Sequence, residues 1–186
     1  MSAVAKHGDV KYWENIDNTI RYISQELKVL HYYESLTSLY GLRDYKKLLG
    51  DSNAYNGILA ATAGVITNDG SVIGIMGYKQ PEGTSFDACA IDKDRYCYWI
   101  MVDINGVNNP NRYGYDVFVF NVMGDNKVRP ATNHKRCTPT YDSSSDGHPN
   151  GESCATWVLL KNNMDYKKCI KGAKKYCDID YDILNQ

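Results

Sequence analysis

The sequence predicts an α+β fold in which one long amino-terminal helix packs on an antiparallel β-sheet. Near the start of the chain, apolar residues recur every three or four positions, which is the period of a helix with one buried face. Short runs of β-branched and aromatic residues follow, separated by turn-forming residues, as in antiparallel sheets. The 186 residues are 43% apolar and 23% charged, which suits a single soluble domain over residues 1–186.

The first predicted element is a helix over residues 10–49, followed by a sheet-containing head over residues 50–186. No proline occurs before residue 81, and the apolar side chains fall on a single stripe. The stripe comprises Trp13, Ile16, Ile20, Ile23, Leu27 and Leu30. A stripe of this kind can pack on a sheet or pair with other helices, and we interpret it as an assembly helix.

Four segments of the head are candidate strands. The expected strands lie in GVITNDGSVIGIMGY (64–78), CYWIMVDI (97–104), DVFVFNV (116–122) and CATWVLL (154–160). Within the first segment Asp69–Gly70 is a strong hairpin signal, which predicts two strands there. Between residues 121 and 153 apolar residues are few, so we expect a long ordered loop.

The cysteines predict a disulfide framework. They are Cys89, Cys97, Cys137, Cys154, Cys169 and Cys177. Their number is even and no C-x-x-C pair occurs, which favours disulfides in an oxidising compartment over a zinc site. Six cysteines can pair in many ways, and the preferred set joins neighbours in sequence, so that one bond staples the long loop. Six reduced cysteines in a cytosolic protein remain the alternative.

Composition and motifs favour a protein without catalytic activity. The net charge of −1 gives no reason to expect binding to nucleic acid or to an anionic membrane surface. No nucleophile elbow and no phosphate-binding glycine loop occurs in the sequence. The 16 tyrosines suit surfaces and interfaces, because the ring is apolar and the hydroxyl is polar.

The segment from residue 103 to 116 carries many side-chain oxygens between two predicted strands. Gly106 and Gly114 permit positive φ, and Pro110 stiffens the middle of the turn. Hard cations bind six to eight oxygens, so this segment is a candidate calcium site, although the protein is not expected to require a cofactor. The candidate calcium ligands are Asp103, Asn105, Asn111 and Asp116. The alternative is a network in which these side chains bond the local backbone.

The stretch VDINGVNNPNRYGYDVFVF resembles a motif of bacterial type IV pilin-like proteins and type II secretion pseudopilins. The matching residues are Asp103, Asn105, Gly106, Pro110, Asn111, Gly114, Asp116 and Phe118. The later stretch CATWVLLKNNMDYKKC is similar to the C-terminal region of these proteins through Cys154, Trp157, Val158, Met164, Asp165 and Tyr166. Together with the upstream hairpin, the resemblance covers roughly residues 65–169.

This resemblance implies a structural subunit of a type IV pilus or a type II secretion pseudopilus, with copies of itself or other pilins as partners. It also implies a long amino-terminal helix on an antiparallel sheet, with disulfides shaping the C-terminal region. In pilins the first half of that helix spans the inner membrane before assembly, and this sequence lacks it. We therefore expect a soluble head from an extracytoplasmic fibre, at the cell surface or in the periplasm.

A second interpretation is a free-standing secreted binding module or adhesin. Such a protein would bind its partner through a tyrosine-rich surface. Its binding would depend on calcium if the segment from residue 103 to 116 holds that ion.

Overall fold

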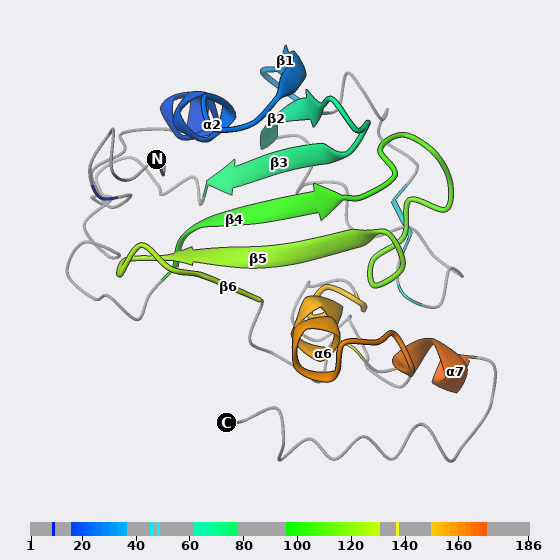
Figure 1. The fold of residues 1–186 in the computed structure, drawn as a ribbon. Coiled ribbons are helices and arrows are strands. Elements are labelled where there is room, and N and C mark those ends of the chain that lie inside the picture. The colour runs from blue at the N-terminus through cyan, green and yellow to red at the C-terminus, as the bar shows by residue number, and fades with distance from the viewer. Residues whose placement is uncertain are drawn as a thin grey trace.

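Six strands form one antiparallel sheet in which each strand pairs with its neighbours in sequence (Figure 1). The computed structural model describes residues 9, 16–36, 45–46, 48, 62–77, 96–130, 137 and 150–170. The strands are β1 (Val29–Tyr33), β2 (Thr62–Thr67), β3 (Val72–Gly77), β4 (Tyr96–Asp103), β5 (Val117–Met123) and β6 (Val128–Pro130). The helices named here are α2 (Ile16–Ser24), α6 (Cys154–Lys161) and α7 (Tyr166–Ile170).

The prediction of one long helix over residues 10–49 is wrong. Helix α2 spans nine residues and ends at Ser24, and β1 begins only five residues later, at Val29. Consequently the α+β plan with a long helix on the sheet is replaced by a sheet that is covered by short helices. The antiparallel sheet itself is present, with six strands.

The end of α2 has a local cause and a tertiary cause. After the helix the backbone tightens, because the amides of Glu26 and Leu27 donate to carbonyl oxygens only three residues back, at 3.1 and 3.2 Å. The following sequence, VLHYY, is rich in residues that favour strands, and it pairs with β2. A register shift between Val29 and His31 interrupts this pairing, and the side chain of Leu30 there is 65% exposed.

The hairpin predicted at Asp69–Gly70 is confirmed. It joins β2 to β3, and Gly70 has a φ of 86°, which the turn requires and which glycine adopts at little cost. The amide of Gly70 donates to the carbonyl of Thr67 at 2.9 Å, and the Thr67 amide donates to the carbonyl of Ser71 at the same distance. The residues of this turn therefore set the register in which β2 pairs with β3.

Buried side chains cover both faces of the sheet. On one face Ile20 of α2 packs against a cluster that includes Val65, Ile75, Tyr98 and Val122. On the other face the cluster consists of Leu36, Tyr45, Val72, Met101, Tyr113, Val117 and Val119. Since side chains alternate along a strand, this division follows from the pairing of Gly74 with Met101 and of Ile75 with Ile100.

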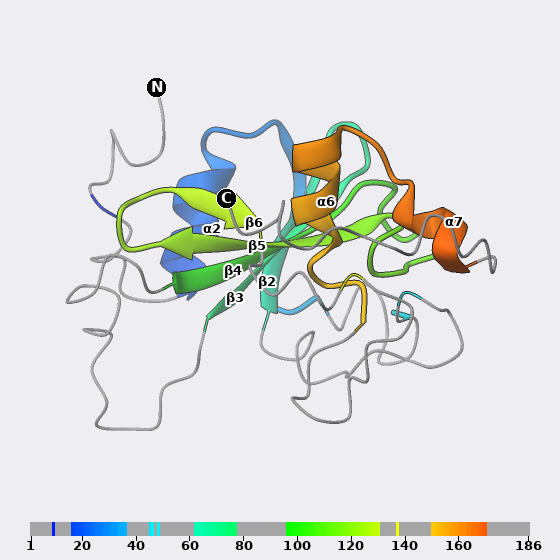
Figure 2. The same ribbon diagram turned by 90° about the horizontal axis from the view of Figure 1, so that it is seen from below.

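The segment CATWVLL, predicted as a strand, forms helix α6 instead. A short apolar run is compatible with either structure, and here a left-handed Asn162, with a φ of 51°, ends the helix. Helices α6 and α7 lie toward one end of the sheet and α2 lies toward the other (Figures 1 and 2). The loop that joins β4 to β5 lies at the same end as α6 and α7 (Figure 1).

Candidate functional site

The connection between β4 and β5, residues 104–116, is the β4–β5 loop. At its start the Asp103 side chain is fully buried, and its Oδ2 accepts a 3.0 Å hydrogen bond from the hydroxyl of Tyr45. The Oδ1 of Asp103 accepts a 3.3 Å hydrogen bond from the amide of Asn105. One carboxylate thus links strand β4, the loop and a segment 58 residues earlier in the chain.

At the end of the loop the Asp116 carboxylate accepts two backbone hydrogen bonds. Its Oδ2 accepts from the amide of Asn111 at 2.9 Å, and its Oδ1 accepts from the amide of Arg112 at 2.6 Å. Asn111 follows a cis Asn109–Pro110 peptide and has a φ of 45°. Asp116 thus supplies the acceptor for two consecutive backbone amides of the loop.

The asparagines bond carbonyl oxygens of the same loop. The side-chain nitrogen of Asn105 donates to the carbonyl of Asn109 at 3.2 Å, and that of Asn108 donates to the carbonyl of Asn105 at 2.9 Å. When the Asn111 amide is assigned from its hydrogen-bond surroundings, its nitrogen donates to the carbonyl oxygens of Gly106 and Asn108, both at 3.0 Å. The side chains therefore form a local network of the kind expected when Asx residues hold a turn.

Three of the four predicted calcium ligands lie in this loop and Asp103 directly precedes it, but most of their polar groups already bond the protein. Asp103 and Asp116 accept bonds from Tyr45, Asn111 and Arg112. Within the described part of the chain, no three His, Cys, Asp or Glu side chains gather as a metal site would require. Calcium binding remains a prediction.

The loop is also tied to Lys46 and Leu48. The Lys46 amide donates to the carbonyl of Asn111 at 2.9 Å, and the Tyr113 amide donates to the carbonyl of Lys46 at 3.0 Å. The guanidinium of Arg112 donates to the carbonyl of Leu48, with Nε at 2.7 Å. The Leu48 amide in turn donates to the carbonyl of Asn150 at 2.8 Å, so this short segment connects the loop to the C-terminal part of the chain.

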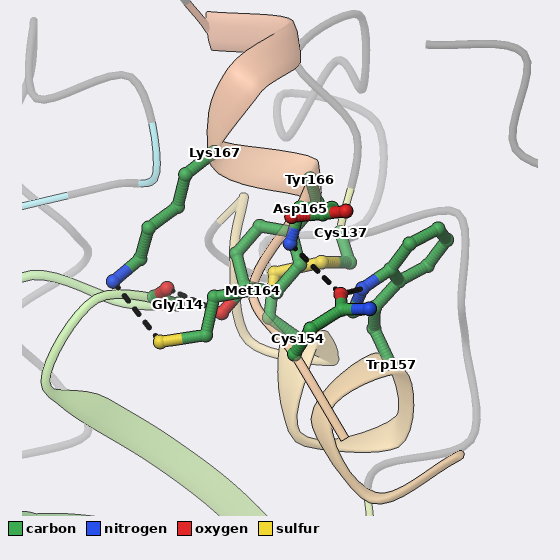
Figure 3. Close-up of a disulfide and its surroundings, with 9 residues drawn as sticks. Gly114, Cys137, Cys154, Trp157, Met164, Asp165, Tyr166 and Lys167 are labelled. Carbon is green, nitrogen blue, oxygen red and sulfur yellow. Dashed lines mark hydrogen bonds between the residues drawn. A yellow bond between two sulfur atoms is a disulfide. The ribbon is translucent and has the colours of Figure 1, made fainter. Parts of the chain in front are cut away.

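Residues 150–170, which contain α6 and α7, form a unit that we call the clasp. A disulfide joins Cys154, at the start of α6, to Cys137 (Figure 3). After α6 the side-chain oxygen of Asn163 accepts bonds from the indole nitrogen of Trp157 at 2.8 Å and from the amide of Asp165 at 3.0 Å. These two bonds fix the turn between the helices and set the position of Tyr166.

The clasp contacts the loop directly through Tyr166. Its hydroxyl donates a 2.6 Å hydrogen bond to the carbonyl of Gly114, and the ring is fully buried (Figure 3). Gly114 has a φ of 75°, and a Cβ there would lie 2.9 Å from Sγ of Cys154 and from Cδ1 of Leu48. Only glycine allows this approach, which brings the loop backbone against the disulfide.

Two cations lie over the ring of Tyr115. The guanidinium carbon of Arg112 is 4.1 Å from the ring centroid, and Nζ of Lys167 is 4.3 Å from it. Burial lowers the pKa of Lys167, an effect that the charge of Asp116 opposes and that of Arg112 reinforces. Burial also raises the pKa of the Tyr166 phenol, which therefore stays protonated as a donor at neutral pH.

The other predicted site residues have separate outcomes. Cys97 is buried and disulfide-bonded. Cys169 belongs to α7, and Cys89 and Cys177 lie outside the described residues. Of the predicted assembly helix, Ile20 and Ile23 are in α2, Leu27 follows it and Leu30 is in β1. Ile16 begins α2, whereas Trp13 lies outside the described residues.

Three residues that build the site were not predicted as site residues. The roles of Tyr45 and Arg112 depend on contacts with distant segments, for which the sequence holds no local signal. Tyr166, by contrast, is part of the segment that resembles pilin-like proteins, and this resemblance is a signal that could have identified it as a site residue.

No known family, curated protein or solved structure matches this chain. None of the helices in the described residues has the length and apolar character needed to cross a membrane.

Proposed function

We propose that this chain is a structural subunit: the soluble head of a type IV pilus or type II secretion pseudopilus fibre. The observation that carries the proposal is the contact between the two segments that resemble pilin-like proteins. The loop of the first segment, at Gly114, receives the hydroxyl of Tyr166 and the disulfide of Cys154 from the second. Residues that match the motif thus act together in one interlocked structure.

The geometry suits a mechanical role better than a chemical one. The carboxylates of Asp103 and Asp116 accept hydrogen bonds from other parts of the chain. The hydroxyl of Tyr166 donates to a backbone carbonyl. A disulfide removes conformations from the unfolded chain and so favours the folded head outside the cell. Because disulfides persist in oxidising compartments, an extracytoplasmic location accords with the Cys137–Cys154 bond.

The mode of assembly differs from the one expected from the sequence. The residues from 13 to 30 do not form a single assembly helix, because α2 ends at Ser24 and Leu30 belongs to β1. Contacts with other subunits, whether identical copies or other pilins, would use a different surface or a segment outside this sequence.

Four of the 16 tyrosines do not belong to the surface that the adhesin alternative requires. Four tyrosines, Tyr45, Tyr98, Tyr113 and Tyr166, are at most 2% exposed and belong to the core. The hydroxyl groups of Tyr45 and Tyr166 donate to Asp103 and to the carbonyl of Gly114, inside the protein. These rings are therefore not available to a ligand.

The proposal is tested by locating the protein in the cells that produce it. Surface fibres are sheared off, collected by sedimentation and probed with an antibody against the purified chain, with a cytosolic enzyme as the control for lysis. We expect the chain in the sheared fraction or in an inner-membrane pool that feeds it. Recovery only with the cytosolic control would contradict the proposal.

A further inference from the structure

The contacts among three segments define a junction. Its members are Lys46, Leu48, residues 112–115 and residues 150–154. Backbone bonds cross it from Tyr113 to Lys46 and from Leu48 to Asn150, at 3.0 and 2.8 Å. The bond from Arg112 to the Leu48 carbonyl crosses it as well. The junction lies beside the sheet rather than within it, at the end where α6 and α7 are found (Figure 1).

The junction has a hydrophobic cluster of its own. Leu48, Cys137, Cys154 and Tyr166 form a buried group that is separate from the two clusters on the faces of the sheet. All four are at most 4% exposed. Small clusters of this kind can open without global unfolding, because protein regions differ in their local opening free energy. Half of the buried members of this cluster are the two disulfide cysteines.

We infer that the Cys137–Cys154 disulfide is an oxidation-dependent lock on this junction: without the bond, the junction opens while the sheet stays folded. The bond forms when the two thiols lose two protons and two electrons to a small disulfide such as glutathione disulfide, which leaves as two thiols. Closure places Sγ of Cys154 against Gly114 and brings Tyr166 within hydrogen-bonding distance of the Gly114 carbonyl. This lock would operate whether or not the protein forms fibres.

Amide hydrogen exchange tests the lock on the full chain. The reporters are the amides of Leu48 and Tyr113, because their bonds cross the junction. The reference amides are those of β3 and β4, which pair in the centre of the sheet. Oxidised wild-type protein is compared with the variant Cys137→Ala/Cys154→Ala in its oxidised state, so that the disulfide of Cys97 in β4 is intact in both proteins.

In the variant we expect both reporters to exchange at least about tenfold faster and the reference amides to stay within about threefold. Unchanged reporters would overturn the inference. An equal acceleration of reporters and references would also overturn it, because the disulfide would then stabilise the whole molecule. A redox-insensitive junction and a uniformly weakened fold are thus distinguished in one experiment.

If the double variant does not fold, a second variant tests the contact between clasp and loop that the inference requires. Tyr166→Phe keeps the disulfide and removes the bond from the Tyr166 hydroxyl to the Gly114 carbonyl. We expect the Tyr113 amide to exchange about three- to tenfold faster, with the β3 and β4 amides unchanged. Exchange at Tyr113 equal to that of the wild-type protein would show that the clasp does not hold the loop.

Discussion

Tyr45 and Asp103 are 58 residues apart in the chain, yet the Tyr45 hydroxyl donates a 3.0 Å hydrogen bond to Oδ2 of Asp103. Both side chains are at most 1% exposed. Removing the donor leaves a buried carboxylate oxygen without this partner, and such a loss costs about 2 kcal/mol. We predict this destabilisation for Tyr45→Phe, measured by urea unfolding.

The matched control for Tyr45→Phe is Tyr33→Phe. Tyr33 is half-buried against the same cluster, and its hydroxyl makes no hydrogen bond within the described part of the chain. A change below about 0.5 kcal/mol is expected for it. Equal effects of the two variants would show that the bond to Asp103 adds nothing to stability.

The contact between Gly114 and the disulfide predicts a difference between two glycines. Gly70 and Gly114 both have positive φ, at 86° and 75°, so alanine is strained at either position. A Cβ at Gly70 would meet nothing within 4 Å, whereas one at Gly114 would lie 2.9 Å from two side-chain atoms. We expect Gly70→Ala to cost about 1 kcal/mol and Gly114→Ala about 3 kcal/mol or more, in chemical denaturation. Similar costs would mean that the clasp can move away from the loop.

The hairpin between β2 and β3 predicts a pH dependence. The Asp69 carboxylate accepts bonds from the Thr67 hydroxyl at 2.5 Å and from the Ser71 amide at 3.1 Å, and these bonds lower its pKa in the folded protein. A lowered folded-state pKa stabilises the protein above the unfolded-state pKa, and this contribution is lost as pH falls through the folded value. The melting temperature of Asp69→Asn should therefore lie below that of the wild-type protein at about pH 6 and converge with it at about pH 2. A constant difference across this range would contradict the assignment, since asparagine keeps an acceptor but has no charge to titrate.

The network in the β4–β5 loop predicts little response to calcium. Because protein donors occupy Asp103 and Asp116, a calcium ion would have to displace them. We expect the melting temperature of the protein in EDTA and that of the protein in free millimolar calcium to differ by less than about 1 °C. A calcium-specific rise, absent with magnesium, would instead support the ligand loop predicted from the sequence.

The sequence identified buried positions better than it identified the conformation of the chain. Ile20 and Ile23 of the predicted stripe do pack against the sheet, and so does Leu27, although it lies beyond the helix. The same spacing continues into VLHYY, where pairing with β2 overrides the helical pattern. The spacing of apolar residues cannot reveal that β1 pairs as a strand, because this pairing depends on residues of β2 more than 30 positions away.

The loop was better predicted, because its signals are local. Positive φ at Gly106 and Gly114 was expected from residue type, and both have it, at 64° and 75°. The Asx network uses side chains and backbone within the loop, which short-range rules describe. The ties from Tyr45 and Tyr166 come from distant segments, and no rule of spacing could have supplied them.

Disulfide mapping of the protein isolated from its native cells tests the central claim most directly. Free thiols are alkylated at harvest, the protein is digested without reduction, and the cross-linked peptides are identified by mass spectrometry. A stapled extracytoplasmic head predicts a cross-linked pair that contains Cys137 and Cys154. Recovery of both cysteines as alkylated free thiols would contradict the account.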